Sequence, residues 1–282
     1  MIQYKRCSEV SIDLMYEAFK DGFSDYIIKM EVSKEDFIKR FLGPEGNTLE
    51  HSFLALDNEK SVGVILGGIK DYESIKTMRC GTLAVHPEYR GMGVSQHLFE
   101  LHKEEAVQNG CKQLFLEVIV GNDRAINFYN KLGYEKVYDL SYYNLNDVTK
   151  LTNKDNKNVE VKKIEFQTFK LEIQKWLNFH INWQNDIDYI EKTNNTYYGA
   201  YVDNDLKGTV CINKHGKISF IFVDKDYRNI GVATQLLQVA NEKLKLATVS
   251  IGFPNNSLLE GFLKKNGFEK NALTQYEMYH LL

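Results

Sequence analysis

Short apolar runs alternate with polar segments along the first half of the chain, and this pattern predicts a mixed α/β domain. Strands are expected at Ile2–Arg6, His51–Leu56, Val62–Gly67, Thr82–Val85 and Gln113–Val120. The turn D-N-E-K between the second and third runs indicates a hairpin. The last run is almost continuously apolar, as expected of a strand that is covered on both faces of its sheet.

Helical periodicity fills the segments between these runs. Helices are expected around Leu14–Phe19, over Ser33–Leu42, from Gly93 to Asn109 and over Ala125–Lys131. Ser33 with Asp36 three residues later resembles a capping box, so the second helix should begin there. The pair Asn109-Gly110 is a typical end for the third.

A polar stretch at residues 146–158 is the best candidate for a linker, and the pattern starts again after it. We therefore expect an N-terminal domain over 1–146, a linker over 147–158 and a C-terminal domain over 159–282. Strands of the second domain are expected at Val159–Ile164, Tyr197–Val202, Gly208–Ile212 and Ile218–Val223. Its helices are expected at Leu171–Ile181, which is rich in aromatic residues, and around Val232–Ala240.

One loop occurs twice. Residues 85–95 read V-H-P-E-Y-R-G-M-G-V-S and residues 223–233 read V-D-K-D-Y-R-N-I-G-V-A. The two arginines are separated by 228 − 90 = 138 positions, and the late glycines Gly133 and Gly267 by 267 − 133 = 134. A period this long indicates two homologous domains rather than a solenoid.

A glycine turn that leads from a strand into a helix can bind an anion. Its backbone N–H groups and the positive end of the helix dipole meet at one point. Gly91 and Gly93 allow positive φ and a close approach, and Arg90 is expected to close the site from the side. The turn lacks G-K-[ST], which excludes a Walker loop, and lacks the third glycine of a dinucleotide fingerprint. The alternative is a tight turn whose glycines serve packing alone.

Both turns resemble the Q/R-x-x-G-x-G/A signature of the GCN5-related N-acetyltransferases, from which Ser95 is a mild departure. Residues 116–134, L-E-V-I-V-G-N-D-R-A-I-N-F-Y-N-K-L-G-Y, are similar to a second signature of that family. The resemblance covers both halves. It implies two tandem acyl-CoA N-acyltransferase-like domains, each α/β with a mixed, mostly antiparallel sheet flanked by helices.

The resemblance also implies acetyl-CoA as cosubstrate, without a metal. Its diphosphate would lie on the backbone of the turn, its pantetheine arm would pair with the preceding strand, and Asn122 would contact the arm from the other side. The implied binding residues are Leu83, Ala84, Val85, Arg90, Gly91, Met92, Gly93, Val94, Ser95 and Asn122.

Acetyl transfer to an amine requires removal of an amine proton and protonation of the leaving thiolate. Tyr129 is the candidate acid, and a core tyrosine is the alternative. Glu117 is the candidate base, because a carboxylate within an apolar strand is costly to bury unless it is paired or functional. In addition, the ribosomal-protein alanine N-acetyltransferases, which the N-terminal half resembles, have a glutamate at this spacing. An ion-paired carboxylate or a water chain is the alternative. His86 is expected to be structural, while Asp21, Asp25 and Tyr26 are candidates for an amine pocket.

The second copy lacks these proton-transfer groups. Aligning Gly267 on Gly133 places Leu263 opposite Tyr129, Ile251 opposite Glu117, and Asn256 opposite Asn122. We therefore expect a catalytic N-terminal domain and a degenerate C-terminal copy, either structural or still able to bind coenzyme A.

The composition of the chain argues against some classes of binding partner. A net charge of −3 gives no sign of a nucleic-acid surface, and no run of 18 apolar residues suggests a membrane span. Four scattered cysteines and no signal-like N-terminus favour a reducing, cytoplasmic setting. The acceptor is expected to be a small-molecule amine or a peptide or protein amine, and a homodimer is left open. The alternatives are a non-catalytic acyl-CoA sensor and a small-molecule acetyltransferase that uses both domains.

Overall fold

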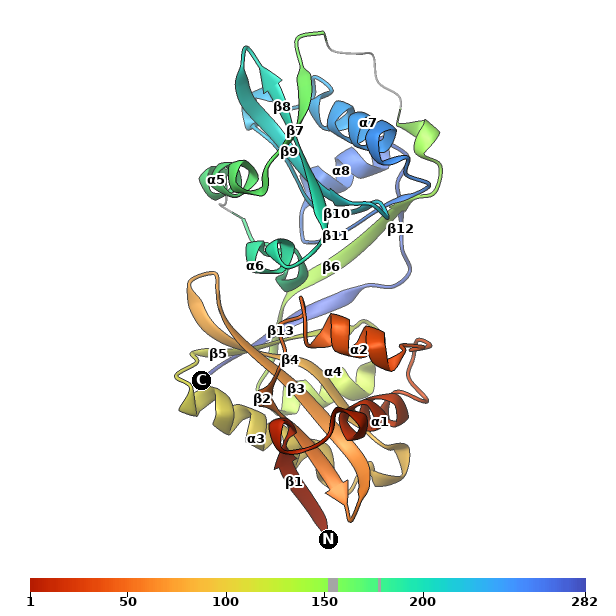
Figure 1. Ribbon diagram of the computed structural model, residues 1–282, viewed down its shortest axis with the longest axis vertical. Coiled ribbons are helices and arrows are strands. Elements are labelled where there is room, and N and C mark those ends of the chain that lie inside the picture. The colour runs from red at the N-terminus through yellow and green to blue at the C-terminus, as the bar shows by residue number, and fades with distance from the viewer. Residues whose placement is uncertain (152–156, 177–178) are drawn as a thin grey trace. The chain divides into compact units, whose positions relative to one another are not determined.

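The computed structural model describes residues 1–151, 157–176 and 179–282. By their contacts these residues form two compact units, the first from Met1–Val137 with Tyr276–Leu282 and the second from Tyr138–Gln275. Each unit holds a sheet with helices on both of its faces (Figure 1). The expected fold class, tandem α/β domains with largely antiparallel sheets, is confirmed.

The first unit begins with a strand and ends with a strand contributed by the C-terminus of the chain. Its sheet order is β1-β2-β3-β4-β5-β13. Neighbours from β1 to β4 are antiparallel, and β4 and β5 are parallel. Its elements are β1 (Ile2–Arg6), η1 (Cys7–Glu9), α1 (Ile12–Gly22), α2 (Lys34–Phe41), β2 (Thr48–Asp57), β3 (Lys60–Tyr72), β4 (Ile75–Val85), η2 (Pro87–Tyr89), α3 (Val94–Gln108), β5 (Gln113–Ile119), α4 (Asp123–Lys131) and most of β13 (Gln275–Leu281).

The second unit repeats this plan. Its sheet order is β6-β11-β10-β9-β8-β7, with β12 also pairing with β6, and β10 and β11 are its parallel pair. Its elements are β6 (Glu135–Leu145, from Tyr138 on), η3 (Val148–Lys150), β7 (Glu160–Ile164), α5 (Phe166–Trp176), η4 (Trp183–Asn185), α6 (Ile187–Glu191), β8 (Asn195–Val202), β9 (Asp205–Asn213), β10 (Lys217–Val223), η5 (Lys225–Tyr227), α7 (Val232–Leu244), β11 (Val249–Pro254), α8 (Ser257–Lys265) and β12 (Glu269–Lys270).

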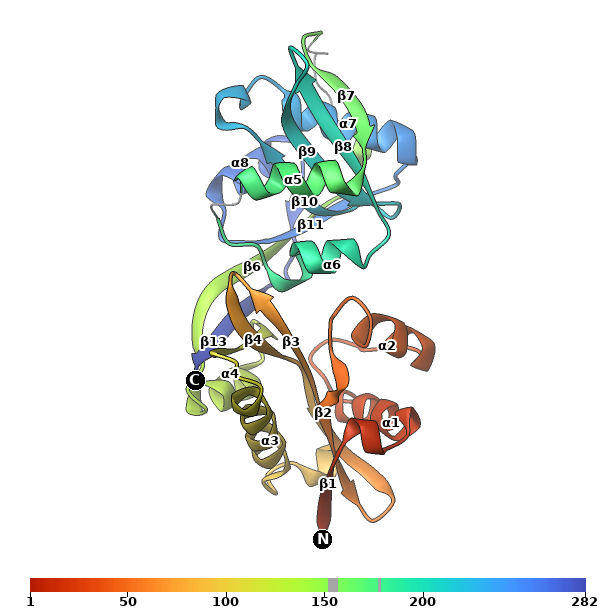
Figure 2. The ribbon, with the colours of Figure 1, turned by 60° about the vertical axis from the view of Figure 1, so that its left-hand side comes forward.

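Each sheet has a separate core on each face. In the first unit α1 and α2 cover one face and α3 and α4 the other (Figure 2). In the second unit α5 and α6 cover one face and α7 and α8 the other. Apolar side chains alternate between these cores, which is why central strands such as β5 are apolar almost throughout.

The units divide the chain differently from the expected boundaries of 1–146 and 159–282. Tyr143 and Leu145 of β6 are fully buried in a core of the second unit, while Met278 of β13 is 1% exposed in a core of the first. A late strand of each half therefore completes the other unit. Local patterning does not show this, because β6 (E-K-V-Y-D-L-S-Y-Y-N-L) and β13 (Q-Y-E-M-Y-H-L) mix polar and apolar residues, and no strand was predicted at either place.

Several local predictions are confirmed. Ser33 caps α2 by accepting a hydrogen bond from Asp36 N, and Gly93 is the N-cap of α3. The expected helix Leu171–Ile181 instead spans Phe166–Trp176, and residues 177–178 lie outside the described residues. Residues 152–156 of the expected linker also lie outside them. Within the described residues, no helix has the length and apolar character needed to span a membrane.

Candidate active site

The first glycine turn connects β4 to α3 and leaves the start of that helix open. Gly91 and Gly93 have φ values of +76° and +83°. A Cβ on either glycine would meet no atom within 4 Å, so the space in front of the turn is free. No side chain caps α3 at Gly93. The backbone N–H groups in the first turn of α3 have no intrahelical partner, which makes this end of the helix suited to an anion.

The other predicted residues of the turn differ in how far their side chains are exposed to solvent. Met92 is 64% exposed, whereas Val94 is 1% exposed and packs in the core beneath α3. Ser95 is half-buried in the first turn of the helix. Since the Val94 side chain faces the core, that residue can meet a ligand only through its backbone.

Arg90 holds the turn against the rest of the unit rather than standing free beside it. Its Nε donates to Val85 O at 3.0 Å and its Nη2 donates to Gly22 O at 3.0 Å. Both Nη atoms also contact the Asp25 carboxylate, at 2.5 and 2.7 Å. The hydrogen bond from Arg90 lowers the pKa of Asp25. The guanidinium is therefore already neutralised, and Asp25 pairs with it.

The strands before the turn separate. The ladder of β4 with β5 joins only Thr77–Arg79 to Gln113–Phe115. Beyond those residues β4 continues to Val85 and β5 to Ile119, and the two strands do not pair with each other there. Leu83, Ala84 and Val85 pair with β3 on their other side. Their edge toward β5 is the kind of edge to which an extended, amide-bearing ligand can add.

A β-bulge marks the point where β4 leaves β5. Leu66 pairs with Thr82 but Gly67 pairs with Cys80, so Gly81 is the extra residue. A Cβ on Gly81 would lie 2.1 Å from Oδ1 of Asn47, a buried side chain. Any larger residue at position 81 would require the Asn47 side chain to move. Neither residue was predicted from the sequence, because Gly81 has no side chain and Asn47 lies in a distant segment.

Tyr129 reaches this same point from α4. Its hydroxyl interacts with the Cys80 thiol, next to the bulge. The ring is 8% exposed and lies edge-on to Tyr134, with centroids 5.5 Å apart. Burial raises the pKa of Tyr129 well above its usual value, and burial raises the pKa of Cys80 to about 12. Tyr129 therefore keeps its proton at neutral pH, and its hydroxyl can act as a hydrogen-bond donor.

Asn122 lies beside this group. Its Oδ1 accepts from Ala125 N at 3.3 Å, which caps α4. The hydroxyl of Tyr26, which follows α1, interacts with the Asn122 side chain, and burial raises the pKa of Tyr26. Tyr26 also interacts electrostatically with Tyr129. The structure thus gathers Tyr26, Asn122, Tyr129 and Cys80 where the strands separate.

Glu117 lies on β5 in a buried ion-pair network. Arg79 donates to its Oε2 from Nε and Nη2, at 3.0 and 2.6 Å, and donates from Nη1 to Glu45 Oε2 at 2.7 Å. Burial tends to raise the pKa of Glu45, but Arg79 and Arg40 more than offset this and lower it. Glu117 is thus ion-paired, which was one of the alternatives to a catalytic base in the sequence. Its role as a base stays a prediction.

Two further candidates take part in local structure. His86 caps η2, since its Nδ1 accepts from Glu88 N at 3.3 Å. The Asp21 carbonyl accepts from Ser24 Oγ at 2.7 Å in the loop after α1. The expected structural role fits the geometry of His86.

The second turn repeats the backbone of the first. Asn229 and Gly231 have φ values of +64° and +93°, and Arg228 Nε donates to Val223 O at 2.9 Å. The β10–β11 ladder joins only Lys217 and Ile218 to Ser250 and Ile251. A register shift around Ser219, 138 positions after Gly81, repeats the bulge.

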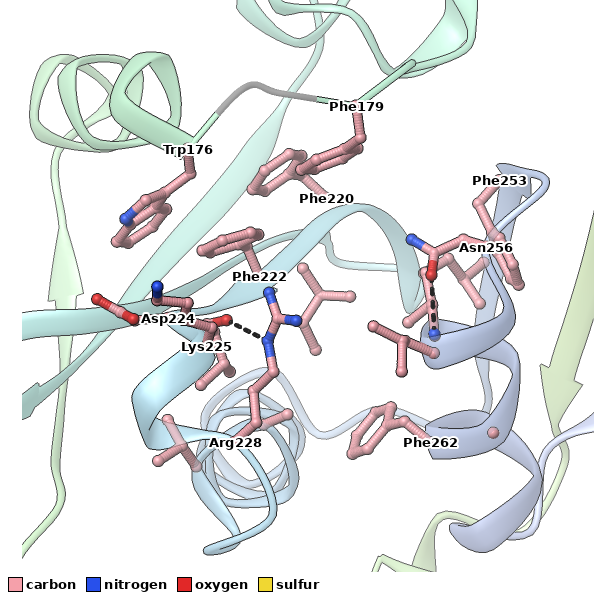
Figure 3. Close-up of a pocket in the computed structure, with 18 of the residues that line it drawn as sticks. Trp176, Phe179, Phe220, Phe222, Asp224, Lys225, Arg228, Phe253, Asn256 and Phe262 are labelled. Carbon is pink, nitrogen blue, oxygen red and sulfur yellow. Dashed lines mark hydrogen bonds between the residues drawn. The ribbon is translucent and has the colours of Figure 1, made fainter.

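The second unit differs in what surrounds its turn. A cavity of about 1850 Å³ lies wholly within this unit, between the turn, the starts of α7 and α8, and the aromatic end of α5 (Figure 3). Asn256 caps α8 by accepting from Leu259 N at 3.0 Å, as Asn122 caps α4. Leu263 is fully buried at the place that corresponds to Tyr129. The cavity was not expected from the sequence.

Comparisons with known proteins match both halves. The model of the acetyltransferase (GNAT) family matches residues 12–134, and that of an acetyltransferase (GNAT) domain matches residues 156–279. N-alpha-acetyltransferase 30 of Schizosaccharomyces pombe is 33% identical over 99 residues, which are 34% of this chain and 65% of that protein. N-alpha-acetyltransferase MAK3 of Arabidopsis thaliana is 31% identical over 94 residues, which are 33% of this chain and 50% of that protein. In each case the chain spans less than two thirds of the relative.

Solved structures share the tandem fold. A tandem GNAT protein from the clavulanic acid biosynthesis pathway has a TM-score of 0.74 at 14% identity, over 100% of this chain and 98% of that one. A GCN5-related N-acetyltransferase from Sphaerobacter thermophilus has a TM-score of 0.70 at 12% identity, over 99% and 95% of the two chains. At these identities the likeness shows the fold alone.

Proposed function

Because the chain belongs to the GNAT acetyltransferase family in both of its halves, we propose that it is an acetyl-CoA-dependent N-acetyltransferase whose N-terminal unit performs the transfer. One observation carries the proposal. The open glycine turn, the separated strands and the Tyr129 hydroxyl all belong to this unit, and the hydroxyl lies on Cys80 where the strands part.

The residues of the first unit are suited to hold acetyl-CoA, the thioester that donates the acetyl group. The backbone from Arg90 to Ser95 would hold the diphosphate, because both glycines leave space and the helix start offers N–H groups. The unpaired edge of Leu83–Val85 would pair with the amides of the pantetheine arm. Asn122 would contact the arm from α4. When bound, the coenzyme supplies an activated acetyl group.

The chain's own side chains would then handle the protons. A primary amine attacks the thioester only after losing a proton, and Glu117 is the candidate to accept it. A backbone N–H near Val85 would stabilise the oxyanion. Tyr129, protonated at neutral pH, would donate to the departing thiolate. The second unit has Leu263 and Ile251 at the corresponding places, so it lacks both proton-transfer groups.

We propose a peptide or protein α-amine as the acceptor. Two of the relatives carry the name N-alpha-acetyltransferase, and their similarity supports this class. Tyr26, next to Asn122 and Tyr129, would line the amine pocket. Asp25 is less suited, because it is paired with Arg90.

A second candidate is an acetyltransferase for a small-molecule amine that uses both units. The observation that favours it is the cavity of about 1850 Å³ in the second unit, which a purely structural copy would not need. A non-catalytic acyl-CoA sensor is the third candidate.

A thiol-release assay on the full-length chain tests these candidates. Acetyl-CoA is offered with peptides that have a free α-amine, with the same peptides N-acetylated, and with a panel of small amines. Turnover of the free peptides alone supports the proposal, and turnover of small amines alone supports the second candidate. Tight binding of acetyl-CoA with no turnover of any amine would overturn the proposal in favour of a sensor.

A further inference from the structure

The cavity of the second unit has an aromatic wall. Trp176, at the end of α5, stacks on Phe222 of β10, with ring centroids 4.6 Å apart and planes at 20°. Phe179 lies parallel to Phe222, with centroids 6.0 Å apart and planes at 3°, and 6.3 Å from Phe220 (Figure 3). The Phe179 side chain is 38% exposed. The wall therefore presents flat apolar faces that neighbouring rings already hold in place.

The same cavity is strongly basic. Its lining residues include one carboxylate, Asp224, and the cations Lys150, Lys157, Lys175, Lys225, Arg228 and Lys265. Of these cations only Lys175 forms an ion pair, with Glu172 at 2.6 Å, among the described residues. Unpaired cations around a cavity favour an anionic occupant.

Arg228 is the cation best placed to bind an anion beside the aromatic wall. Its Nε is used by Val223 O, and its guanidinium carbon lies 5.5 Å from the centroid of the Phe222 ring. In the part of the chain that the structure describes, no carboxylate pairs with it. Its counterpart Arg90 is instead ion-paired with Asp25 and donates a hydrogen bond to Gly22 O. Arg228 thus has both Nη atoms left for a ligand.

The aromatic wall comes from larger side chains on one strand. Phe220 and Phe222 occupy the positions that correspond to Thr82 and Ala84, at the offset of 138. In the first unit the end of α1 packs directly on β4, since a Cβ on Gly22 would lie 2.7 Å from the Ala84 Cβ. In the second unit bulky rings stand on the corresponding face and line the cavity. This site therefore arises from residues in which the two copies differ.

We propose that this cavity binds a small organic anion that carries a flat apolar ring, of which an aryl carboxylate is the simplest. The carboxylate pairs with the Nη atoms of Arg228, which match it bidentately, and the ring extends the stack of Trp176, Phe222 and Phe179. This goes beyond acetyl transfer in the first unit and does not depend on it.

Isothermal titration of the full-length chain with phenylacetate tests the proposal. We expect a dissociation constant of about millimolar or below for so small a ligand. Phenylacetamide, which lacks the charge, and cyclohexylacetate, which lacks the flat ring, should each bind about tenfold or more weakly. Equal affinity for phenylacetate and phenylacetamide, or no heat with phenylacetate at about 10 mM, would overturn it.

Variants locate the ligand. Arg228→Gln should weaken binding roughly 10–100-fold, and Trp176→Leu should weaken it several-fold. Lys214→Gln, which removes one charge from a residue outside the cavity lining, is the matched control and should bind normally. Arg228→Lys keeps the charge without the bidentate fork, and replaces Arg228→Gln if that variant fails to fold. Unchanged binding in the folded Arg228 variant contradicts the proposal.

A competition with coenzyme A, itself a ring-bearing anion, distinguishes the source of the ligand. Phenylacetate that binds equally well in saturating coenzyme A occupies a separate place, which supports a free acid as the natural ligand. If coenzyme A displaces phenylacetate, the two ligands share the site. The adenine nucleotide of the coenzyme would then be the natural ligand of Arg228 and the aromatic wall. Loss of acetyl transfer in the first unit affects neither readout.

Discussion

Arg79 donates two hydrogen bonds to a single carboxylate oxygen of Glu117, from Nε at 3.0 Å and from Nη2 at 2.6 Å. The two side chains are 5% and 4% exposed. Removing one partner of such a pair leaves a buried charge and costs about 3–5 kcal/mol. Glu117 therefore contributes to the fold whatever it does in catalysis, and a substitution there needs separate readouts for stability and for activity.

Glu117→Gln separates the two roles. Glutamine keeps an oxygen that can accept from Arg79, but it cannot take a proton from an amine. If Glu117 is the base, kcat/KM at pH 7 should fall by about 10²–10⁴-fold. The deficit should shrink as the pH approaches the pKa of a peptide α-amine, about 8, because the amine above that pH needs no base. A pH–rate profile checks this, and a profile of unchanged shape with a lower melting temperature would leave Glu117 a structural role only.

Tyr129→Phe removes the hydroxyl that faces Cys80 and leaves the ring. At saturating acetyl-CoA we expect kcat to fall by about 10²–10⁴-fold, because the thiolate then leaves without a proton donor. Stability should fall by about 1 kcal/mol, the value of one hydrogen bond. Steady-state kinetics and urea denaturation measure the two effects. Unchanged turnover would remove Tyr129 from the mechanism.

Tyr134→Phe is the matched control for that variant. Tyr134 is a neighbouring tyrosine, 2% exposed, whose hydroxyl has no hydrogen-bond partner among the described residues. Deleting a buried hydroxyl that makes no hydrogen bond should leave stability unchanged or raise it by about 1 kcal/mol. Turnover should be unchanged. A loss of turnover equal to that of Tyr129→Phe would show that disturbing this aromatic cluster, rather than losing the acid, inactivates the enzyme.

The need for positive φ at Gly91 can be tested by introducing asparagine, the residue at the corresponding position 229 of the second turn. Asn229 takes a φ of +64° where Gly91 takes +76°, and a Cβ on Gly91 would meet nothing within 4 Å. Asparagine tolerates this region whereas β-branched residues do not. Gly91→Asn should therefore change the melting temperature little, while Gly91→Val should destabilise by about 1–2 kcal/mol and raise the KM for acetyl-CoA. Equal behaviour of the two variants would contradict a strict positive-φ requirement.

Features that depend on neighbours in the chain could be predicted from the sequence. The glycine turn, the Ser33 cap and the strand runs each rest on a few consecutive residues, whose backbone preferences are local. The Asn122 cap of α4 belongs to the same class, although Asn122 was predicted only as a contact to the ligand.

Features that depend on contacts between distant segments could not be predicted. Arg79 meets Glu45 and Glu117 only after three separate segments come together. The exchanged strands β6 and β13 mix polar and apolar residues, so their pattern does not say which sheet each joins. The cavity depends on the volumes of Phe220 and Phe222 relative to the residues that face them, which is a property of packing rather than of a motif.

His102 should make the first unit sensitive to acid. It is fully buried in α3, neither ring nitrogen has a hydrogen-bond partner among the described residues, and burial lowers its pKa to about 3. In the unfolded chain the pKa is about 6.5, so between these values the unfolded state binds a proton that the folded state refuses. The stability present above pH 6.5 is therefore lost progressively as the pH falls toward 3. From this group alone we expect a loss of about 2 kcal/mol at pH 5 relative to pH 7.

Denaturant unfolding of His102→Leu at both pH values tests this expectation. Leucine does not titrate, so the variant should lose less stability between pH 7 and pH 5 than the parent, by about 2 kcal/mol. Paired carboxylates such as Glu105, whose pKa is lowered despite its burial because His51 and Arg6 donate to it, contribute a similar acid slope to both proteins and cancel in the comparison. His215→Leu, at an exposed histidine in the second unit, should show the same pH dependence as the parent. Parallel pH dependences for His102→Leu and the parent would mean that His102 is protonated in the folded chain or that the core around it opens at mild acidity.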